Sequence, residues 1–444
     1  MELKGRRVLV IGLARTGVAC ARFLVDKEAL VTMSDVRPES EMNEQIKSLA
    51  GLPIRYFLGT EERGCLDNMD YIVPSPGVAA VNPLLCEAKA RGIPVLGEIE
   101  LAHRFFRAPL ICCTGTNGKS TTTTLIGEML KADGRRVFVG GNLGTPFIGG
   151  VDGEWDWGVL EISSFQLEWI EHFRPRIAVL LNVTEDHLDR YAAFDDYRRA
   201  KERIFAAQTE SDFAVLNRDD PLVWALKERL KPRVVSFGHS PVGEGVSATG
   251  DIITWRDGPN EDLFSLAGGK IQGVHNVENM MAAVAAAKLA GISHGAIRQS
   301  LETFPGLEHR LEFVRETDGV KYYNDSKGTN VGAVVKSLAG FSAPVILIAG
   351  GVDKGGDYGP LMEGIRRKVR RLVLFGAAKE VIARALGHLT ETVIVEDLAS
   401  AVRDAAAAAH SGDVVLLSPA CSSFDQFRDY AERGKVFKNL VLSL

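Results

Sequence analysis

The feature that most constrains the fold of this chain is a glycine-rich loop, residues 114–121, which lies between a predicted strand and a predicted helix. The apolar run Leu110–Cys113 indicates a buried strand, and apolar residues recur at helical spacing from Ser120 to Asp133. Glycines in such a loop let phosphate oxygens approach the backbone, a lysine adds positive charge, and a serine hydroxyl can bind Mg²⁺. The loop therefore predicts a site for a magnesium-bound polyphosphate in an α/β domain.

This phosphate-binding loop departs from the usual pattern at one position. Cys113 stands where the first glycine is usually found, so the loop is the tighter variant Gly-x-x-Gly-Lys-Ser. A glycine-rich turn without function is the alternative. It is disfavoured because strand, glycines, Lys-Ser and helix occur in the order that phosphate binding requires.

The length of 444 residues exceeds what one hydrophobic core usually organises, and we expect three domains, over residues 1–97, 98–304 and 305–444. The formal charge of −5 provides no basic surface, so we expect no nucleic-acid partner. The six cysteines are scattered, which indicates reduced thiols in a cytoplasmic protein. The amino terminus lacks a signal-peptide pattern and no apolar run approaches the length of a membrane span, so we expect no membrane association.

The first domain begins with a pattern that is typical of dinucleotide-binding units. A strand at Arg7–Ile11 precedes a Gly-Leu-Ala-Arg-Thr-Gly turn over residues 12–17, and Asp35 ends the next strand. Because the middle glycine is replaced by Ala14, NAD is only one candidate ligand and a uridine diphosphate group is another. Asp35 would bind ribose or base, or it is only a turn aspartate.

Acidic and amide side chains follow two predicted strands of the central domain. Glu161 ends the strand 157–160, at the carboxyl edge where parallel sheets place their ligands, and Asn142 follows the strand 137–139. Mg²⁺-nucleotide chemistry needs an acidic residue near Ser120, so we expect Glu161 to bind the metal rather than to be an exposed strand-end residue.

His187 follows a strong predicted strand, residues 177–183, and has Glu185, Asp186 and Asp189 close to it in the chain. A histidine in a loop is usually a surface residue, but the position of His187 beside the phosphate-binding loop favours an active-site role. Lys201 lies in a predicted helix, residues 195–208, and the pattern around it alone indicates a solvated helix lysine.

Three polar turns in the third domain, residues 324–330, 350–356 and 418–425, each follow a predicted strand. The alternation of strands and helices indicates a doubly wound, mainly parallel sheet, so the three turns are expected to meet at one edge. Lys327 and Lys354 would make that edge a binding face for an anionic substrate.

Five segments together resemble the Mur ligases of peptidoglycan synthesis: residues 114–120, 161–168, 182–191, 324–327 and 418–421. Within that family, the segments 165–168 and 424–427 favour the members that add D-glutamate. The resemblance implies an α/β fold of three domains. These are a Rossmann-like N-terminal domain, a central P-loop-type ATP-binding domain with a mainly parallel sheet, and a Rossmann-like C-terminal domain.

The resemblance also implies the substrates, which are ATP, D-glutamate and UDP-N-acetylmuramoyl-L-alanine. Residues expected to bind the UDP substrate are Arg15, Thr16, Asp35, Arg37, Ser75, Gly77, Asn142 and His187. Those expected to bind the nucleotide are Gly115, Thr116, Asn117, Gly118, Lys119, Ser120, Thr121, Asn279, His309, Arg310 and Asp325. Those expected to bind D-glutamate are Lys327, Thr329, Lys354, Ser423, Phe424 and Tyr430.

By the same resemblance, the catalytic residues are Lys119, Glu161, His187 and Lys201. Two Mg²⁺ ions are implied, with Ser120, Glu161, His187 and Lys201 as ligands, the lysine carrying a carbamate. The implied reaction forms an acyl phosphate, which the amine of D-glutamate attacks, and the enzyme is expected to be a monomer. Two alternatives remain at this point, an NAD-dependent dehydrogenase and a nucleotide-switched binding module.

Overall fold

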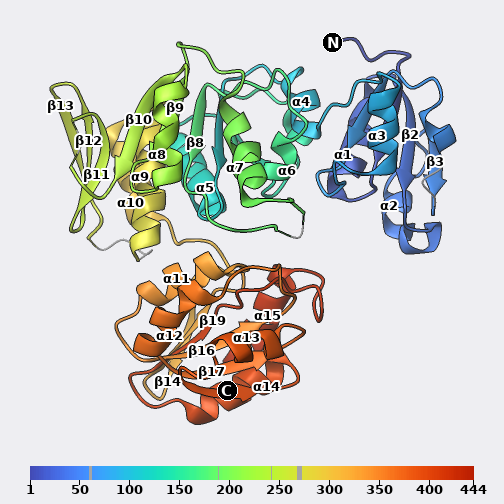
Figure 1. Ribbon diagram of the computed structural model, residues 1–444. Helices are drawn as coiled ribbons and strands as arrows, with labels where there is room; N and C mark the ends of the chain where they lie inside the picture. Colours follow the sequence, from blue (N-terminus) through green and yellow to red (C-terminus); the bar gives the residue numbers. More distant parts are fainter. Residues whose placement is uncertain (60–62, 189, 242, 268–272) are drawn as a thin grey trace.

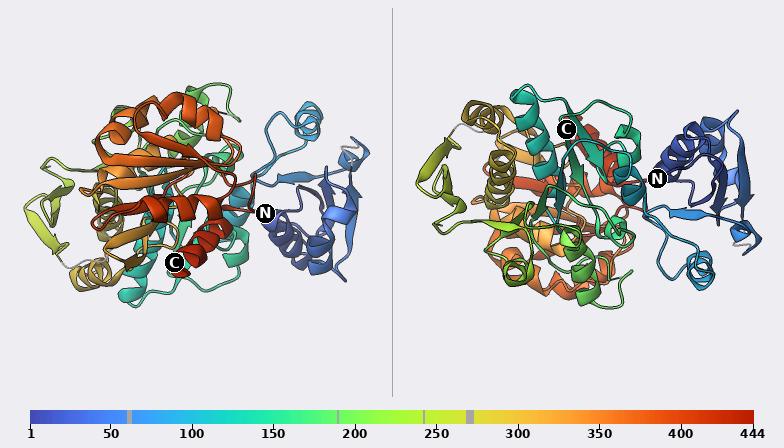
Figure 2. Two further views of the ribbon diagram at one scale, coloured as in Figure 1. Left: turned by 90° about the horizontal axis from the view of Figure 1, so that it is seen from below. Right: turned by 90° about the horizontal axis from the view of Figure 1, so that it is seen from above.

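The computed structural model describes residues 1–59, 63–188, 190–241, 243–267 and 273–444, which form three α/β domains (Figure 1). The N-terminal domain, in blue, lies to one side of the central domain, and the orange and red C-terminal domain packs below it. The views in Figure 2 show the same arrangement, with the N-terminal domain projecting from the body that the other two form. The three sheets fall within the three expected ranges, and the exact domain boundaries stay a prediction.

The N-terminal sheet is fully parallel, in the order β3-β2-β1-β4. Its strands are β1 (Arg7–Ile11), β2 (Leu30–Asp35), β3 (Ile54–Leu58) and β4 (Tyr71–Pro74), and its helices are α1 (Arg15–Asp26), α2 (Asn43–Ser48) and α3 (Pro83–Ala90). The apolar residues in the segment 93–96 also predict a strand, and this prediction is wrong, since only an isolated bridge joins Val95 to Ile72. Pro94 lacks the N–H that a continuing ladder needs.

The central sheet has nine strands in the order β13-β12-β11-β10-β9-β8-β5-β7-β6, parallel from β6 to β11 and antiparallel beyond. The strands are β5 (Leu110–Thr114), β6 (Val137–Gly141), β7 (Trp157–Glu161), β8 (Ile177–Leu180), β9 (Phe213–Asn217), β10 (Arg233–Gly238), β11 (Gly245–Thr249), β12 (Ile252–Asp257) and β13 (Asn260–Ser265). The helices are α4 (Glu98–His103), α5 (Lys119–Ala132), α6 (Ser164–Leu167), α7 (Phe194–Glu202), α8 (Pro221–Trp224), α9 (Val274–Leu289) and α10 (His294–Thr303).

The phosphate-binding loop sits at the carboxyl end of β5, which lies between β7 and β8. Helix α5 leaves the loop and buries Leu125, Ile126 and Met129 in a core shared with the alanine-rich helix α9. Burial of these apolar side chains fixes α5 on the sheet, and this holds the loop at its first turn in place. The expected strand–loop–helix unit is confirmed.

The C-terminal sheet is mixed, in the order β14-β15-β19-β16-β17-β18, with only β14 antiparallel to its neighbour. Its strands are β14 (Glu312–Thr317), β15 (Val320–Asn324), β16 (Val345–Gly350), β17 (Val369–Phe375), β18 (Glu391–Ile394) and β19 (Val414–Leu417). Its helices are α11 (Val331–Ala339), α12 (Met362–Lys368), α13 (Lys379–Leu386), α14 (Leu398–Ala408) and α15 (Tyr430–Leu442). Strands β15, β19 and β16 are neighbours, so the three polar turns meet at one edge, as predicted.

None of the helices in the described part of the chain combines the length and the apolar character that a membrane span requires.

Candidate active site

The phosphate-binding loop has a backbone that only glycine accommodates at its last position before the helix. Gly118 has a φ of 89°, in the left-handed region that favours glycine. A Cβ atom there would lie 2.1 Å from Oδ1 of Asn279, which comes from α9. Without a side chain at Gly118, Asn279 can lie close to the loop. The first N–H groups of α5 have no partner within the helix and can bind an anion.

Side chains from neighbouring elements fix the shape of the loop. Asn182 accepts a hydrogen bond from the Asn117 N–H at 2.8 Å and donates one to the Asn117 carbonyl oxygen at 3.1 Å. The hydroxyl of Thr116 lies 3.1 Å from that of the buried Tyr197. Lys119 Nζ donates to the carbonyl oxygens of Gly115 and Thr116, at 2.9 and 2.8 Å. Its ammonium group thus already lies over the loop where phosphates would bind.

Glu161 ends β7 beside the loop, and its side chain is 1% exposed. Oε1 accepts a hydrogen bond from Asn142 Nδ2 at 2.6 Å, whereas Oε2 is buried and has no hydrogen-bond partner among the described residues. Burial alone would raise the pKa of Glu161, but the charges of Lys119 and Lys327 hold it below its ordinary value. The site therefore contains a carboxylate with one oxygen available to a cation.

Lys201 lies beneath the loop, and the interpretation of this residue as a solvated helix lysine is wrong. Its side chain is 2% exposed, and Nζ donates to the carbonyl oxygen of Gly115 at 2.8 Å. Tyr197 precedes it by one helical turn and buries the same face of α7. Burial, reinforced by the charge of Lys119, lowers the pKa of Lys201 well below its ordinary value, which favours the neutral amine.

His187 reaches the same region from the turn after β8. Its φ of 57° is unusual for a residue other than glycine, and its ring lies against Phe165 with 4.8 Å between the centroids. Burial lowers the pKa of His187 to about 4, against the opposing charge of Asp186. At neutral pH the imidazole is uncharged, as a metal ligand must be. Asp189, from the same segment, lies outside the described residues.

Asp186, next to His187, connects the central domain to the C-terminal domain. Its carboxylate accepts hydrogen bonds from Lys354 Nζ at 3.2 Å and from Asn330 Nδ2 at 3.1 Å. Lys354 and Asn330 belong to two of the polar turns of the C-terminal domain. The sequence grouped Asp186 with the acids near the site but gave no sign of these partners, because the contact forms only when two domains meet.

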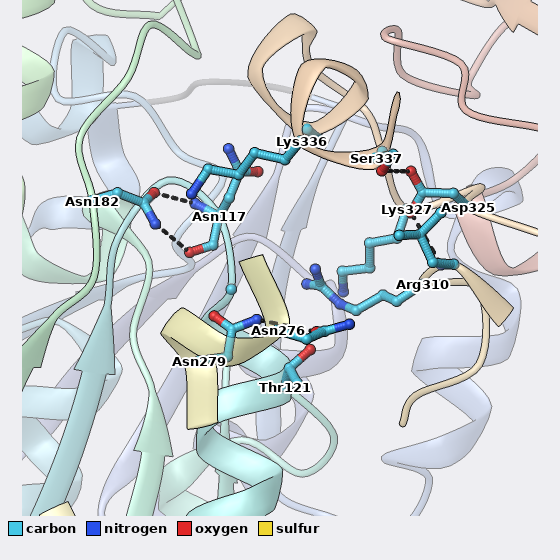
Figure 3. A pocket seen from close by; sticks show the side chains of 14 residues that line it. Asn117, Thr121, Asn182, Asn276, Asn279, Arg310, Asp325, Lys327, Lys336 and Ser337 are labelled. Atoms are coloured by element: carbon cyan, nitrogen blue, oxygen red, sulfur yellow. Dashed lines mark hydrogen bonds between the residues drawn. The ribbon is translucent and has the colours of Figure 1, made fainter. Parts of the chain in front are cut away.

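The cavity at the loop lies between the central and C-terminal domains, and Figure 3 shows Arg310 and Lys327 extending into it from the latter. Arg310 donates to the hydroxyl of Ser120 at 3.1 Å. Asp325, held by the hydroxyls of Ser337 and Ser418 at 2.7 and 2.6 Å, is a third residue from that domain in the lining. The volume of this cavity is about 50 Å³.

Six of the eleven expected nucleotide residues line this cavity. Gly115, Thr116, Lys119 and Ser120 belong to the same loop but are not among the lining residues, and the ring of His309 lies elsewhere. That ring is buried within the C-terminal domain, where Nδ1 accepts a hydrogen bond from Asn324 Nδ2 at 2.9 Å. Expected nucleotide residues in the lining are Asn117, Gly118, Thr121, Asn279, Arg310 and Asp325.

A second cleft, of about 750 Å³, opens at the carboxyl ends of β1, β2 and β4 in the N-terminal domain. Asp35 lines it, but its oxygens already accept hydrogen bonds from Arg37 and from the backbone N–H of Leu13, as in a turn aspartate. His187 is the one expected UDP-substrate residue that does not line this cleft. The expected residues that do are Arg15, Thr16, Asp35, Arg37, Ser75, Gly77 and Asn142.

The residues expected to bind the amino acid are distributed unevenly. Thr329 and Lys354 line a third cavity, of about 340 Å³, between the turn 184–188 and the C-terminal domain. Lys327 Nζ donates to the hydroxyl of Tyr430 at 2.8 Å. Ser423, in the third turn, is buried. Phe424 is 73% exposed and lines none of the three cavities, so its expected role stays a prediction.

Three family models match the chain in order. A Mur ligase MurD-like N-terminal domain matches residues 6–97, a Mur ligase middle domain residues 113–287, and a Mur ligase glutamate ligase domain residues 309–421. Among curated proteins, one from Geotalea daltonii is 51% identical over all of this chain and 99% of its own length, and one from Geobacter metallireducens is 50% identical over the same shares. Both carry the name UDP-N-acetylmuramoylalanine–D-glutamate ligase.

Solved structures with the same fold are more distant in sequence. A UDP-N-acetylmuramate-alanine ligase from Thermotoga maritima aligns with a TM-score of 0.60 at 20% identity, over 98% of this chain and 99% of that one. A MurF ligase from Thermotoga maritima in complex with ADP aligns with a TM-score of 0.60 at 18% identity, over 100% and 96%. These likenesses confirm the three-domain α/β architecture.

Proposed function

The chain belongs to the Mur ligase family, and from this premise we propose that it joins D-glutamate to UDP-N-acetylmuramoyl-L-alanine at the expense of ATP. The observation that carries the proposal is the high identity, over the whole chain, to curated proteins named for that reaction. We do not propose the two alternatives, an NAD-dependent dehydrogenase and a nucleotide-switched binding module, because neither explains why all three domains match Mur ligase models.

The proposal is tested by measuring ADP release from the purified protein with a panel of UDP-muramoyl precursors and of D- and L-amino acids. We expect release only when ATP, UDP-N-acetylmuramoyl-L-alanine and D-glutamate are present together. Release with L-alanine, or with a diamino acid on a longer precursor, would assign the chain to another reaction. Release that is indifferent to amino acids would refute the ligase.

The proposed reaction begins with transfer of the terminal phosphate of ATP to the L-alanine carboxylate, because a free carboxylate is a poor acyl donor. Lys119 would offset charge on the transferring oxygens, and the amides of the loop would orient them. The amine of D-glutamate then attacks the acyl carbon, the tetrahedral oxyanion collapses as the bond to phosphate breaks, and the nitrogen loses a proton, so that an amide and free phosphate remain. Arg310 and Lys327 would keep the site positive while the domains exclude water from the acyl phosphate.

The residues around the loop fit a magnesium site that is completed by phosphate. No group of three histidine, cysteine or acidic side chains that could hold a metal occurs in the part of the chain that the structure describes. Mg²⁺ commonly uses one or two carboxylates together with substrate phosphates, and the unpartnered oxygen of Glu161 offers such a ligand. Ser120 and the neutral His187 would add to it. Two bound ions would neutralise phosphate charge during transfer.

A carbamate on Lys201 is part of the proposal. CO₂ adds to a neutral amine, and burial favours that form of Lys201. The modified side chain would be an anion beside Lys119, able to serve as a further magnesium ligand.

We also propose that the uridine diphosphate occupies the N-terminal cleft and that D-glutamate lies among the turns that carry Lys327 and Lys354. Arg15 Nη2 donates to the backbone oxygen of Asn142 at 3.4 Å, which joins that cleft to the central domain. All three substrates would then be held by one chain, so a monomer suffices. We place this reaction in the cytoplasm.

Replacing Gly118 by alanine should weaken ATP binding at least about tenfold, equivalent to ~1.4 kcal/mol. The added Cβ would overlap Asn279 Oδ1 and force the loop or α9 to move. Gly134 at the other end of α5 is a matched control, because its φ of 79° is also left-handed but nothing lies within 4 Å of its Cβ position. Both substitutions should cost ~1–2 kcal/mol of unfolding free energy through backbone strain. Calorimetry measures the ATP affinity of both variants, and equal affinities would contradict the role of Gly118 in phosphate binding.

Raising the pH through 8 should raise the KM for D-glutamate. Burial and the nearby Arg310, against Glu161, lower the pKa of Lys327 to about 8, so the free site loses a positive charge as the pH passes that value. An anionic substrate binds more weakly to the neutral amine. Lys327→Arg keeps its charge and should shift the rise in KM to higher pH, whereas the amine of the substrate titrates identically in both enzymes. Superimposable pH profiles would exclude Lys327 from the amino-acid site.

A further inference from the structure

Arg433, on α15, is a fully buried cation that the sequence interpretation did not single out. Its Nε donates to the hydroxyl of Ser326 at 3.0 Å, and Nη2 donates to the Ser326 carbonyl oxygen at 2.8 Å. Further bonds from its terminal nitrogens, at 3.3 to 3.5 Å, reach the carbonyl oxygens of Gly350, Cys421 and Ser422. One guanidinium therefore contacts all three polar turns of the C-terminal domain.

These contacts lie directly behind the residues proposed to bind D-glutamate. Ser326 precedes Lys327, Ser422 precedes Ser423, and Gly350 opens the turn that carries Lys354. Parallel strands alone set the distance between such turns, but not the orientation of the backbone within each. The planar fork of an arginine fixes several acceptors at once in defined directions.

The acceptors of Arg433 are unusual for a buried arginine. Every hydrogen-bond acceptor recorded for it in the described chain is a backbone carbonyl or a hydroxyl, and none is a carboxylate. A buried charge is costly unless its hydrogen bonds compensate, and an apolar side chain of similar volume often stabilises a fold as well. Packing alone therefore does not explain why a guanidinium group occupies this buried position. Its hydrogen bonds to the three polar turns do explain it.

We propose that Arg433 is a positioning residue that sets the geometry of the D-glutamate site by clamping the three turns together. The inference rests on the proposed function of that site. Ser326 extends the clamp, since its hydroxyl also donates to the carbonyl oxygen of Tyr430 at 2.8 Å. Tyr430 in turn accepts a hydrogen bond from Lys327, so the clamp leads directly to a proposed ligand of the amino acid.

The test compares Arg433→Lys with the wild type in steady-state assays that vary each substrate separately. Lysine keeps the charge but loses the fork, so the KM for D-glutamate should rise at least about tenfold, since small misplacements of binding groups have large effects. The KM for ATP should rise clearly less than the KM for D-glutamate, because the phosphate-binding loop belongs to another domain and only part of the nucleotide cavity comes from this one. Lys435→Met, which removes an exposed cation from the same helix, should leave all three KM values unchanged.

Chemical rescue provides the second measurement. Arg433→Ala should lose D-glutamate affinity in the same way, and millimolar methylguanidine should restore part of it. If the alanine variant does not fold, the lysine variant still decides. Unchanged KM for D-glutamate in Arg433→Lys, or an equal rise for all three substrates, would overturn the positioning role. A wild-type enzyme that does not respond to D-glutamate would instead refute the proposed function.

Discussion

Replacing Lys201 by alanine is expected to leave the enzyme almost inactive, with kcat lowered about a thousandfold. The proposed carbamate would serve as a magnesium ligand, and loss of several kcal/mol of charge stabilisation during phosphoryl transfer corresponds to that factor. The side chain is buried against the carbonyl oxygen of Gly115, so no water-exposed group can take its place without rearrangement. Formate or acetate, which can enter the space left by the truncation, should restore part of the activity.

Arg199→Ala is the matched control for Lys201, because it removes an exposed cation from the same helix. It should retain wild-type kcat and thermal stability. The carbamate itself is measured by ¹³C NMR of the wild-type enzyme equilibrated with ¹³CO₂, where a carbamate signal should be present and Lys201→Ala should lack it. Full activity of Lys201→Ala would remove the carbamate from the mechanism.

Replacing Glu161 by glutamine is expected to abolish magnesium-dependent turnover, again by about a thousandfold. The amide keeps the size of the side chain and can still accept the hydrogen bond from Asn142, but it has no charge to offer a cation. The variant should need a much higher Mg²⁺ concentration than the wild type to reach half of its maximal activity. In calorimetry, Mg²⁺ should strengthen the binding of ATP to the variant less than it does for the wild type.

Glu154→Gln serves as the control for Glu161, since that exposed carboxylate precedes the same strand and pairs with Arg136 at the surface. Its kinetics should not change. If Glu161→Gln turned over normally at low Mg²⁺, the unpartnered oxygen of Glu161 would need an explanation other than metal binding.

The parts of the site that depend on local backbone chemistry could be predicted from the sequence. The loop around Gly118 and Lys119 needs a particular residue type at each position, and Glu161 follows an apolar strand whose direction fixes where the side chain lies. The prediction that the three polar turns meet at one edge was confirmed for the same reason, since parallel strands deliver their carboxyl ends together.

Features that depend on contacts between distant segments could not be predicted in this way. The pattern around Lys201 shows a polar helix, and only the packing of α7 under the loop makes that lysine buried. Helix α15 was not predicted from the sequence. Arg433 was not identified either, because a single arginine in a charged C-terminal segment resembles a surface residue. The predicted strand over 93–96 failed on a proline whose effect on the ladder outweighed the apolar pattern.

The contact of Lys354 with Asp186 has a consequence for the energetics of the amino-acid site. If Lys354 binds a carboxylate of D-glutamate as proposed, this carboxylate replaces that of Asp186. The free-energy cost of removing water from an unpaired ammonium group is then avoided. Until D-glutamate binds, Asp186 would occupy the position of its carboxylate and hold the Lys354 ammonium group in place. The same exchange would remove one ion pair between the central and C-terminal domains while the bond from Asn330 to Asp186 still joins them, so binding of the last substrate would be linked to how tightly the two domains hold together.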